Sequence, residues 1–440
     1  MFFGVPGLKR TLSTFFVSIL LGMTLSCGYN NNSNTQSSQS KLTHRVFVSN
    51  PLHPTSGGGG APALEIIDDS KDVLSPFLVS LSGAGPDAGL MAVSPKKDRT
   101  LVFSPSSNSL GIVDNTTESA IGSVALLGPT ESIFISEDDI TAFVAVPGAL
   151  VSGQPTAGAV ERINISTGAV TATIPIPGAH FLIPNPAGNQ IMVISDSADA
   201  VTMLAPSLID SGNPLTAVTG SFDRPTWAVF DSGGSTAFII NCGQECGGLM
   251  PASVAVIDMS QNPPAPLAAA PAPIAVTGGA SIGFLNGSSL YLAGTAPGSN
   301  CASASPATSA TTCGRFTVFD TSSLTLGGSV TITDGRHNRM EMGANGQLFI
   351  GARNCTNVNL PSDVRGCLSM VNTIGSISQA SVTAAPDNGD VTGIAPIPSR
   401  NVVYVCEGGL FRIYDTTTDK LQSDQISIIG QPIDVKVVDF

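Results

Sequence analysis

Cysteine and histidine are the residues in this chain whose types and spacing are best suited to chemistry. Eight cysteines and four histidines are spread over 440 residues. Six of the cysteines form three pairs that are close in the sequence: Cys242 with Cys246, Cys301 with Cys313, and Cys355 with Cys367. Local pairs of this kind are typical of disulfides that pin loops in exported proteins. Of the two that remain, we expect Cys406 to be a buried free thiol.

Motifs for metal, haem and calcium chemistry are absent from the sequence. The segment "CGQEC" (242–246) has no second cysteine pair beside it, and there is no HxH, HExxH or CxxCH. The acidic turns "SEDD" (136–139) and "DSAD" (196–199) lack the DxDxDG spacing of a calcium loop. We therefore expect no bound metal or cofactor and interpret both acidic segments as solvated turns.

The first residues have the organisation of an export signal. A positive "LKR" (8–10) precedes an apolar "TFFVSILLGMTL" (14–25), which is too short for an ordinary membrane-spanning helix. The following "TLSC" resembles the lipobox of bacterial lipoproteins, although Thr24 and Leu25 depart from its usual Leu and small residue. The resemblance implies lipidation of Cys27, a membrane anchor, and a location in the periplasm or on the cell surface; the alternative is a secreted protein.

Three segments follow from this interpretation. We expect a signal peptide at residues 1–26 and the lipidated cysteine with a flexible linker at 27–43, because "GYNNNSNTQSSQSK" is polar and aperiodic. Residues 44–440 then form a single folded domain. With 42% hydrophobic and 12% charged residues, this domain has enough apolar material for a large core.

Composition favours an all-β fold. The chain has 47 Gly and 31 Pro, with few Lys and Glu, which disfavours helices and favours short strands joined by turns. Its formal net charge of −13 repels nucleic acid phosphates, so we exclude a nucleic acid partner. The same charge leaves no basic patch for anionic lipid headgroups.

An internal repeat organises residues 45–440. A strand that ends before a Ser/Thr-rich turn occurs eight times: "LEIIDDSKD", "LGIVDNTTE", "INISTG", "VTMLAPS", "VAVIDMSQ", "FTVFDTSS", "LSMVNTIG" and "FRIYDTTTD". A second type of strand precedes a hairpin turn, as in "LMAVSPKKD" and "FLIPNPAGN". The units recur at a spacing of roughly 40–60 residues, and repeats of this length indicate a ring or array of small sheets.

The repeat resembles the β-propeller units of the YVTN, surface-layer and lactonase-like family, whose "YVTN" appears here as "YVCE" (404–407) and "MVIS" (192–195). The resemblance implies blades of four antiparallel strands. Counting favours eight blades over the alternative of seven. The chain enters at "RVFVSNP" (45–51) as a second strand and ends with "IDVKVVDF" as a first strand, so we expect the C-terminal strand to complete the N-terminal blade and close the ring.

The longest insertions fall between second and third strands, which meet on one face that we call the top face. They are residues 51–62, 147–158, 242–251, 294–314 and 353–367, and they contain all three cysteine pairs. Loops on a rigid scaffold commonly carry binding residues, although long loops also drift without function because extra length costs little entropy.

The same register places several ionisable residues at the entrances of first strands, where a propeller's central channel opens. His180 and His337 each follow a glycine there. We expect a polar site at the channel mouth with six members: Glu131, His180, Arg224, Arg336, His337 and Asp390. The two histidines belong to blades four and seven, so ordinary turn hydrogen bonds explain them equally well.

Two classes of function remain open. The first is a monomeric, envelope-anchored binding or scaffold protein that uses the disulfide-pinned top-face loops and is not catalytic. The alternative is an enzyme at the channel mouth, either a lactonase-like hydrolase or a metal or redox-cofactor protein. With one Trp and four Tyr the chain offers few stacking surfaces for sugars, so a protein or peptide partner is favoured.

Overall fold

The computed structural model describes residues 39–298, 314–356, 364–365, 368–375, 377, 380–382 and 389–439. The predicted signal peptide, Cys27, Cys301, Cys313 and Cys367 lie outside these residues. Among the residues that the structure describes, no helix has the length and apolar character needed to cross a membrane.

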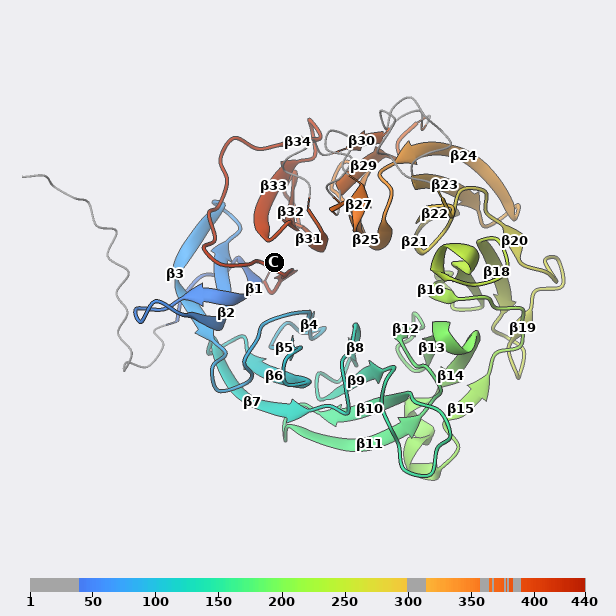
Figure 1. The fold of residues 1–440 in the computed structure, drawn as a ribbon, viewed down its shortest axis with the longest axis horizontal. Helices are drawn as coiled ribbons and strands as arrows, with labels where there is room; N and C mark the ends of the chain where they lie inside the picture. Colours follow the sequence, from blue (N-terminus) through green and yellow to red (C-terminus); the bar gives the residue numbers. More distant parts are fainter. Residues whose placement is uncertain are drawn as a thin grey trace, which may run out of the picture. The chain divides into compact units, whose positions relative to one another are not determined.

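Eight antiparallel sheets of four or five strands form the blades of a propeller, which confirms the predicted eight-blade fold (Figure 1). From the inner strand outward, blades 1 to 4 are β35 (Asp434–Val437), β1 (Arg45–Pro54), β2 (Gly60–Asp68), β3 (Val73–Ser80); β4 (Met91–Val93), β5 (Arg99–Ser104), β6 (Ser109–Asp114), β7 (Ser119–Ala125); β8 (Ser132–Ile135), β9 (Thr141–Val146), β10 (Ala159–Asn164), β11 (Ala169–Pro175); and β12 (Phe181–Pro184), β13 (Ile191–Ser195), β14 (Ala200–Leu204), β15 (Leu215–Ala217).

Blades 5 to 8 continue the ring with the same strand order. They are β16 (Pro225–Phe230), β17 (Thr236–Asn241), β18 (Ser253–Asp258), β19 (Ala265–Pro266), with β20 (Ile274–Ala275) also on β18; β21 (Ile282–Asn286), β22 (Ser289–Gly294), β23 (Gly314–Asp320), β24 (Thr325–Ile332); β25 (Arg336–Met342), β26 (Gln347–Arg353), β29 (Leu368–Asn372), β30 (Ala380–Val382); and β31 (Val391–Pro396), β32 (Val402–Glu407), β33 (Leu410–Asp415), β34 (Lys420–Leu421). A hairpin of β27 (Cys355–Thr356) and β28 (Val364–Arg365) and the 3-10 turns η1 (Asp196–Ala198), η2 (Pro206–Ser211) and η3 (Gly243–Cys246) lie between strands.

The recurring Asp and Ser/Thr turn has a simple physical cause. At the end of β33, the carboxylate of Asp415 accepts hydrogen bonds from the backbone amides of Thr417 (2.7 Å) and Thr418 (2.9 Å), and Asp320 does the same for Ser322 and Ser323 after β23. These bonds replace the strand pairing that the turn interrupts. The repeat seen in the sequence is therefore the turn between third and fourth strands.

Side-chain alternation creates a hydrophobic core at every junction between neighbouring blades. On β1, Val46 and Val48 pack against blade 8, whereas Phe47 between them packs against blade 2. The fourth strands are half exposed. On β11, for example, exposed residues alternate with partly or fully buried ones. Because successive side chains of a strand point to opposite faces, second and third strands read as continuous apolar runs and fourth strands as alternating ones.

The C-terminal strand closes the ring as predicted. β35 pairs antiparallel with β1, with Val437 opposite Val46 and Val435 opposite Val48. Figure 1 shows the C-terminus inside the ring beside β1, so the two ends of the propeller share blade 1. Closure leaves no blade face uncovered, which is why the last strand of the sequence is needed by the first blade.

Candidate functional site

A central cavity of about 920 Å³ lies inside the ring. First strands from β4 around to β25 supply its wall. Lys436 on β35 and Ile433, which directly precedes β35, also line it. Glu131 and Arg336 lie at the ends of first strands that begin on the top face, so this end of the cavity is the predicted channel mouth. Cavities of this size accommodate small organic molecules.

The mouth contains a histidine held between two carboxylates. The Nδ1 of His180 lies 3.1 Å from the Asp196 carboxylate, and its Nε2 lies 3.5 Å from the Glu131 carboxylate. Gly178, at φ 64°, makes the turn that leads into β12, and the imidazole stacks on Phe181 at 4.0 Å. The mouth therefore brings together Glu131 and His180 from the predicted set, and it adds Asp196, which the sequence analysis interpreted as part of a solvated turn.

Protonation states follow from this geometry. The hydrogen bond with His180 holds the pKa of Glu131 down at about 2. Burial alone would lower the pKa of His180, but its bonds to Asp196 and Glu131 outweigh burial and raise that pKa to about 9. At neutral pH the mouth thus holds an imidazolium between two carboxylates, and His180 has no free lone pair with which to act as a base.

This arrangement predicts a pH-dependent contribution to stability. Because the folded-state pKa of His180 is raised, its stabilisation is complete below pH 6.5 and disappears as the pH rises to about 9. We expect the His180→Gln variant to be less stable than the wild type by about 2 kcal/mol at pH 6, after allowance for the exposure of Glu131, with the difference vanishing near pH 9. Urea unfolding across this range measures the difference, and an NMR titration midpoint of His180 near 6.5 would contradict the prediction.

The other four predicted site residues are placed differently. Arg336 reaches the mouth, with Nη2 3.9 Å from the Glu131 carboxylate. Arg224 directly precedes β16, the first strand of blade 5, and its Nη1 donates to the backbone oxygen of Asp196 at 3.4 Å. Asp390 accepts a hydrogen bond from the backbone amide of Asn354 at 2.9 Å and does not line the cavity.

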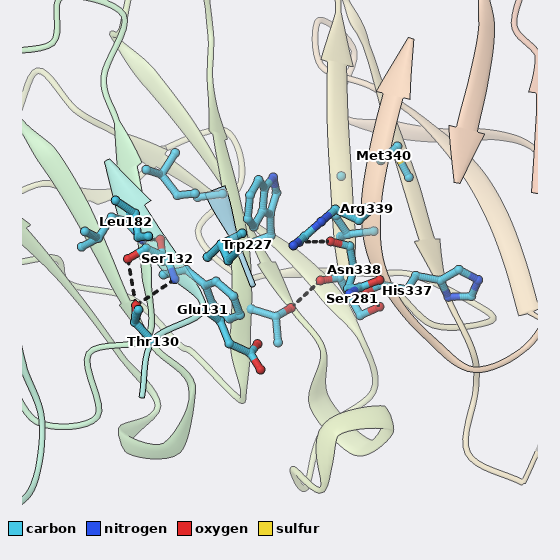
Figure 2. A pocket seen from close by; sticks show the side chains of 18 of the residues that line it. Thr130, Glu131, Ser132, Leu182, Trp227, Ser281, His337, Asn338, Arg339 and Met340 are labelled. Atoms are coloured by element: carbon cyan, nitrogen blue, oxygen red, sulfur yellow. Dashed lines mark hydrogen bonds between the residues drawn. The ribbon is translucent and has the colours of Figure 1, made fainter. Parts of the chain in front are cut away.

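His337 does not join this group. Its ring is buried between blades 6 and 7, with Nε2 3.0 Å from the backbone oxygen of Thr333, and Figure 2 shows it turned away from Glu131. Burial lowers the pKa of His337 to about 4, so it is neutral at physiological pH. The structure therefore gives His180 and His337 separate environments.

The sequence analysis also missed a pentapeptide, "GASIG" (279–283), that matches the GxSxG form of serine hydrolases. Its context is different from a nucleophile elbow because it leads into strand β21 and no helix follows. The buried Ser281 hydroxyl donates to the backbone oxygens of His337 (3.3 Å) and Ala293 (3.4 Å). Ser281 thus ties blades 6 and 7 together, and its hydroxyl proton is directed to backbone oxygens.

One disulfide of the top face lies within the described residues. Cys242 and Cys246 are bonded, as predicted; Cys242 precedes the 3-10 turn η3 and Cys246 is its last residue. Cys355 is also disulfide-bonded, while its predicted partner Cys367 lies outside the described residues. Cys406 is a buried free thiol, and burial raises its pKa well above the usual value, which confirms the expectation for it.

Glu245 on η3 is the most unusual carboxyl group of the top face. Both of its oxygens are buried, and Thr295, Ser281 and Ala280 lie near them without completing hydrogen bonds of good geometry. Burial raises the pKa of Glu245 to about 8 despite these neighbours.

Within the described part of the chain, no group of three His, Cys, Asp or Glu side chains is arranged to hold a metal ion.

Aromatic and basic side chains complete the cavity, and sequence reasoning missed them. Phe181, Trp227 and Phe284 line it from β12, β16 and β21, and Arg339 and Arg353 line it from blade 7. Trp227 packs between blades, and it also contacts Phe181 edge-on at 6.1 Å in the cavity wall. Arg336 and Arg339 are three residues apart on β25, so regular alternation would place them on opposite faces. A register shift between His337 and Arg339 lets both line the cavity, and no pattern in the sequence signals it.

Comparison with known proteins identifies the fold alone. No family model matches the chain, and no curated protein matches it. Among solved structures, the dihydro-heme d1 dehydrogenase NirN in complex with DHE is 13% identical with a TM-score of 0.59, covering 91% of this chain and 76% of that one. A functionally unknown protein from Desulfotomaculum acetoxidans is 12% identical with a TM-score of 0.50, covering 90% and 99%. A periplasmic gluconolactonase from Pseudomonas aeruginosa is 15% identical with a TM-score of 0.46, covering 90% and 98%.

Proposed function

We propose that the protein is an exported β-propeller of the YVTN and surface-layer type, lipid-anchored through Cys27, that binds a protein or peptide partner with its top face. The observation that carries the proposal is the exposure of large apolar side chains on the top-face loops. Leu249 is 88% exposed, Leu150 84%, Met250 62% and Leu52 53%. Single exposed apolar side chains are common on protein surfaces, but these four belong to loops of the same face, as the apolar residues of a protein interface do.

The loop that carries Leu249 and Met250 is held in place. The Cys242–Cys246 disulfide closes its first turn, and the Asp223 carboxylate accepts hydrogen bonds from the backbone amides of both Leu249 (2.8 Å) and Met250. A rigid loop loses little conformational entropy on binding, so its apolar contacts contribute more to affinity. This rigidity supports recognition by the loop.

Two further observations support the proposal. The disulfides at Cys242 and Cys355 fit an oxidising compartment outside the cytoplasm. At the channel mouth, His180 is committed to two ion pairs, so a hydrolase there would lack its most obvious general base at neutral pH. These features favour binding over the alternative of a lactonase-like enzyme.

A photo-crosslinking experiment in the native host tests the proposal. A benzoylphenylalanine at position 150 or 249 is expected to crosslink to one partner, because both positions lie on the top face. Leu208 in η2 is the matched control, since it is 45% exposed on the opposite face. With the purified partner, Leu249→Asp should weaken binding at least tenfold and Leu208→Asp should not.

The contrary results are equally defined. Equal crosslinking from position 208, or no partner from positions 150 and 249, would overturn the proposal. Hydrolysis of lactones by the purified protein, lost in His180→Gln, would favour the enzyme instead.

A further inference from the structure

Three arginines from blade 7 converge on the central cavity. Arg336 and Arg339 lie on β25, and Arg353 ends β26 beside them. Their convergence is notable against the composition, because the chain has only 19 Lys and Arg residues and a formal net charge of −13. A cationic wall inside an acidic protein attracts anions into the cavity.

These guanidinium groups are only partly neutralised by the protein. Arg339 donates to two backbone oxygens, those of Thr392 (3.2 Å) and Asn338 (3.0 Å), and Arg336 only approaches Glu131 at 3.9 Å. Among the described residues, Arg339 and Arg353 form no direct ion pair, although the charge of Glu341 acts on Arg339 and those of Glu131 and Asp390 act on Arg353 from a longer distance.

Arg353 is the least satisfied of the three. Its Nε is buried and has no hydrogen-bond partner in the described structure. Burial lowers the pKa of Arg353, and repulsion from Arg339 and Arg336 adds to this effect, while the charges of Glu131 and Asp390 oppose it without cancelling it. A buried donor left without an acceptor costs free energy, and a bound anion would remove that cost.

An aromatic wall adjoins the arginines. Phe181, Trp227 and Phe284 are each half-buried and line the cavity from consecutive blades 4, 5 and 6. Figure 2 shows Arg339 extending toward the Trp227 side of the cavity. Flat apolar groups gain contact area and favourable ring geometry against such a wall.

From this geometry we infer that the cavity binds a small organic anion, with its carboxylate, sulfonate or phosphate group on Arg353 and Arg339 and a flat apolar body against Phe181, Trp227 and Phe284. Guanidinium groups pair with such oxyanions through two parallel hydrogen bonds. Leu150 and Leu249, which carry the proposal of a protein partner, do not line this cavity, so the two proposals can be tested independently.

Two matched fluorescent probes test the inference on the full exported protein. Anilinonaphthalene sulfonate carries the anionic group, and N-phenyl-1-naphthylamine has the same aromatic body without it. We expect one sulfonate probe to bind per chain, at least tenfold more tightly than the neutral probe, because hydrogen bonds to charged groups are worth about 1.5–3 kcal/mol. Trp227 is the only tryptophan, so energy transfer from it reports binding inside the cavity.

Arginine variants complete the test. Arg353→Met and Arg339→Met should each weaken sulfonate binding about tenfold and leave the neutral probe unchanged. Arg162→Met is the control, since Arg162 pairs with Asp210 on the outside of the ring. If Arg353→Met fails to fold, Arg353→Lys replaces it in the test, because lysine keeps the positive charge. This variant should bind the sulfonate probe with an affinity between those of the wild type and Arg353→Met. Equal affinity for both probes, many sites per chain, or no energy transfer from Trp227 would overturn the inference.

Discussion

Removal of residues 434–440 is expected to abolish cooperative folding of the propeller. β35 supplies the inner strand of blade 1, and Val435 and Val438 are fully buried in the two junctions that flank this blade. Without the strand, β1 has an unpaired edge and both junctions lose part of their core. Domains of this kind have only about 5–15 kcal/mol of stability, so the loss is a large fraction of the total.

Circular dichroism and gel filtration measure the effect of the truncation. A synthetic peptide of residues 430–439 should restore folding by adding the missing strand in trans, because strand addition uses the same backbone hydrogen bonds. A truncated chain that unfolds with the same midpoint as the full chain would show that ring closure is not needed.

A point substitution tests the same closure with a matched control. Val435→Asp buries an unpaired charge and should destabilise the protein by about 4 kcal/mol. Val73→Asp, in β3 of the same blade, should be close to neutral because Val73 is 53% exposed. Equal effects of the two substitutions in urea unfolding would contradict the role assigned to β35.

Glu245→Gln is expected to stabilise the protein, with an effect that grows with pH. The folded-state pKa of Glu245 is raised to about 8, whereas an exposed glutamate titrates near 4.5. Between these values the unfolded chain is ionised at this position while the folded protein must keep the proton, so wild-type stability falls as the pH rises from 4.5 to 8. Glutamine removes this penalty, which amounts to about 3 kcal/mol at pH 7.

Urea unfolding of the two proteins at several pH values checks this prediction. The stability difference should be near zero below pH 4.5, should increase through pH 7, and should become constant above about pH 8. Glu137→Gln, in the hairpin between β8 and β9, is the control for a surface glutamate. A variant that is less stable than the wild type at pH 7 would indicate that the Glu245 carboxylate is ionised and bonded in the folded protein.

Sequence reasoning identified the architecture because local patterns determine it. Residues a few positions apart determine the apolar runs and the Asp-initiated turns, and counting these patterns predicted eight blades. The same count left one strand without a partner at each end of the propeller, which predicted the closure by Val435 and its neighbours. The structure confirmed both. The Cys242–Cys246 disulfide was equally local.

The content of the cavity was harder to predict because it depends on the direction of single side chains from separate blades. His180 and His337 occupy equivalent positions in the sequence, yet one forms ion pairs at the mouth and the other is buried behind its strand. Asp196 directly follows the second strand β13 and Arg353 ends the second strand β26, and only the closed ring brings them to the mouth. Their roles follow from contacts between blades, which the periodicity of a single strand does not predict.

The described chain enters the propeller on one defined face. Ser40 bonds to Glu118 and Arg45 to Asp439, and all four residues lie on the face opposite the top-face loops. Twelve peptide bonds separate Cys27 from Gln39, a reach of at most about 40 Å. Any attachment that the chain makes before Ser40 therefore reaches the propeller on the face opposite Leu150 and Leu249, and it leaves the top-face loops unobstructed.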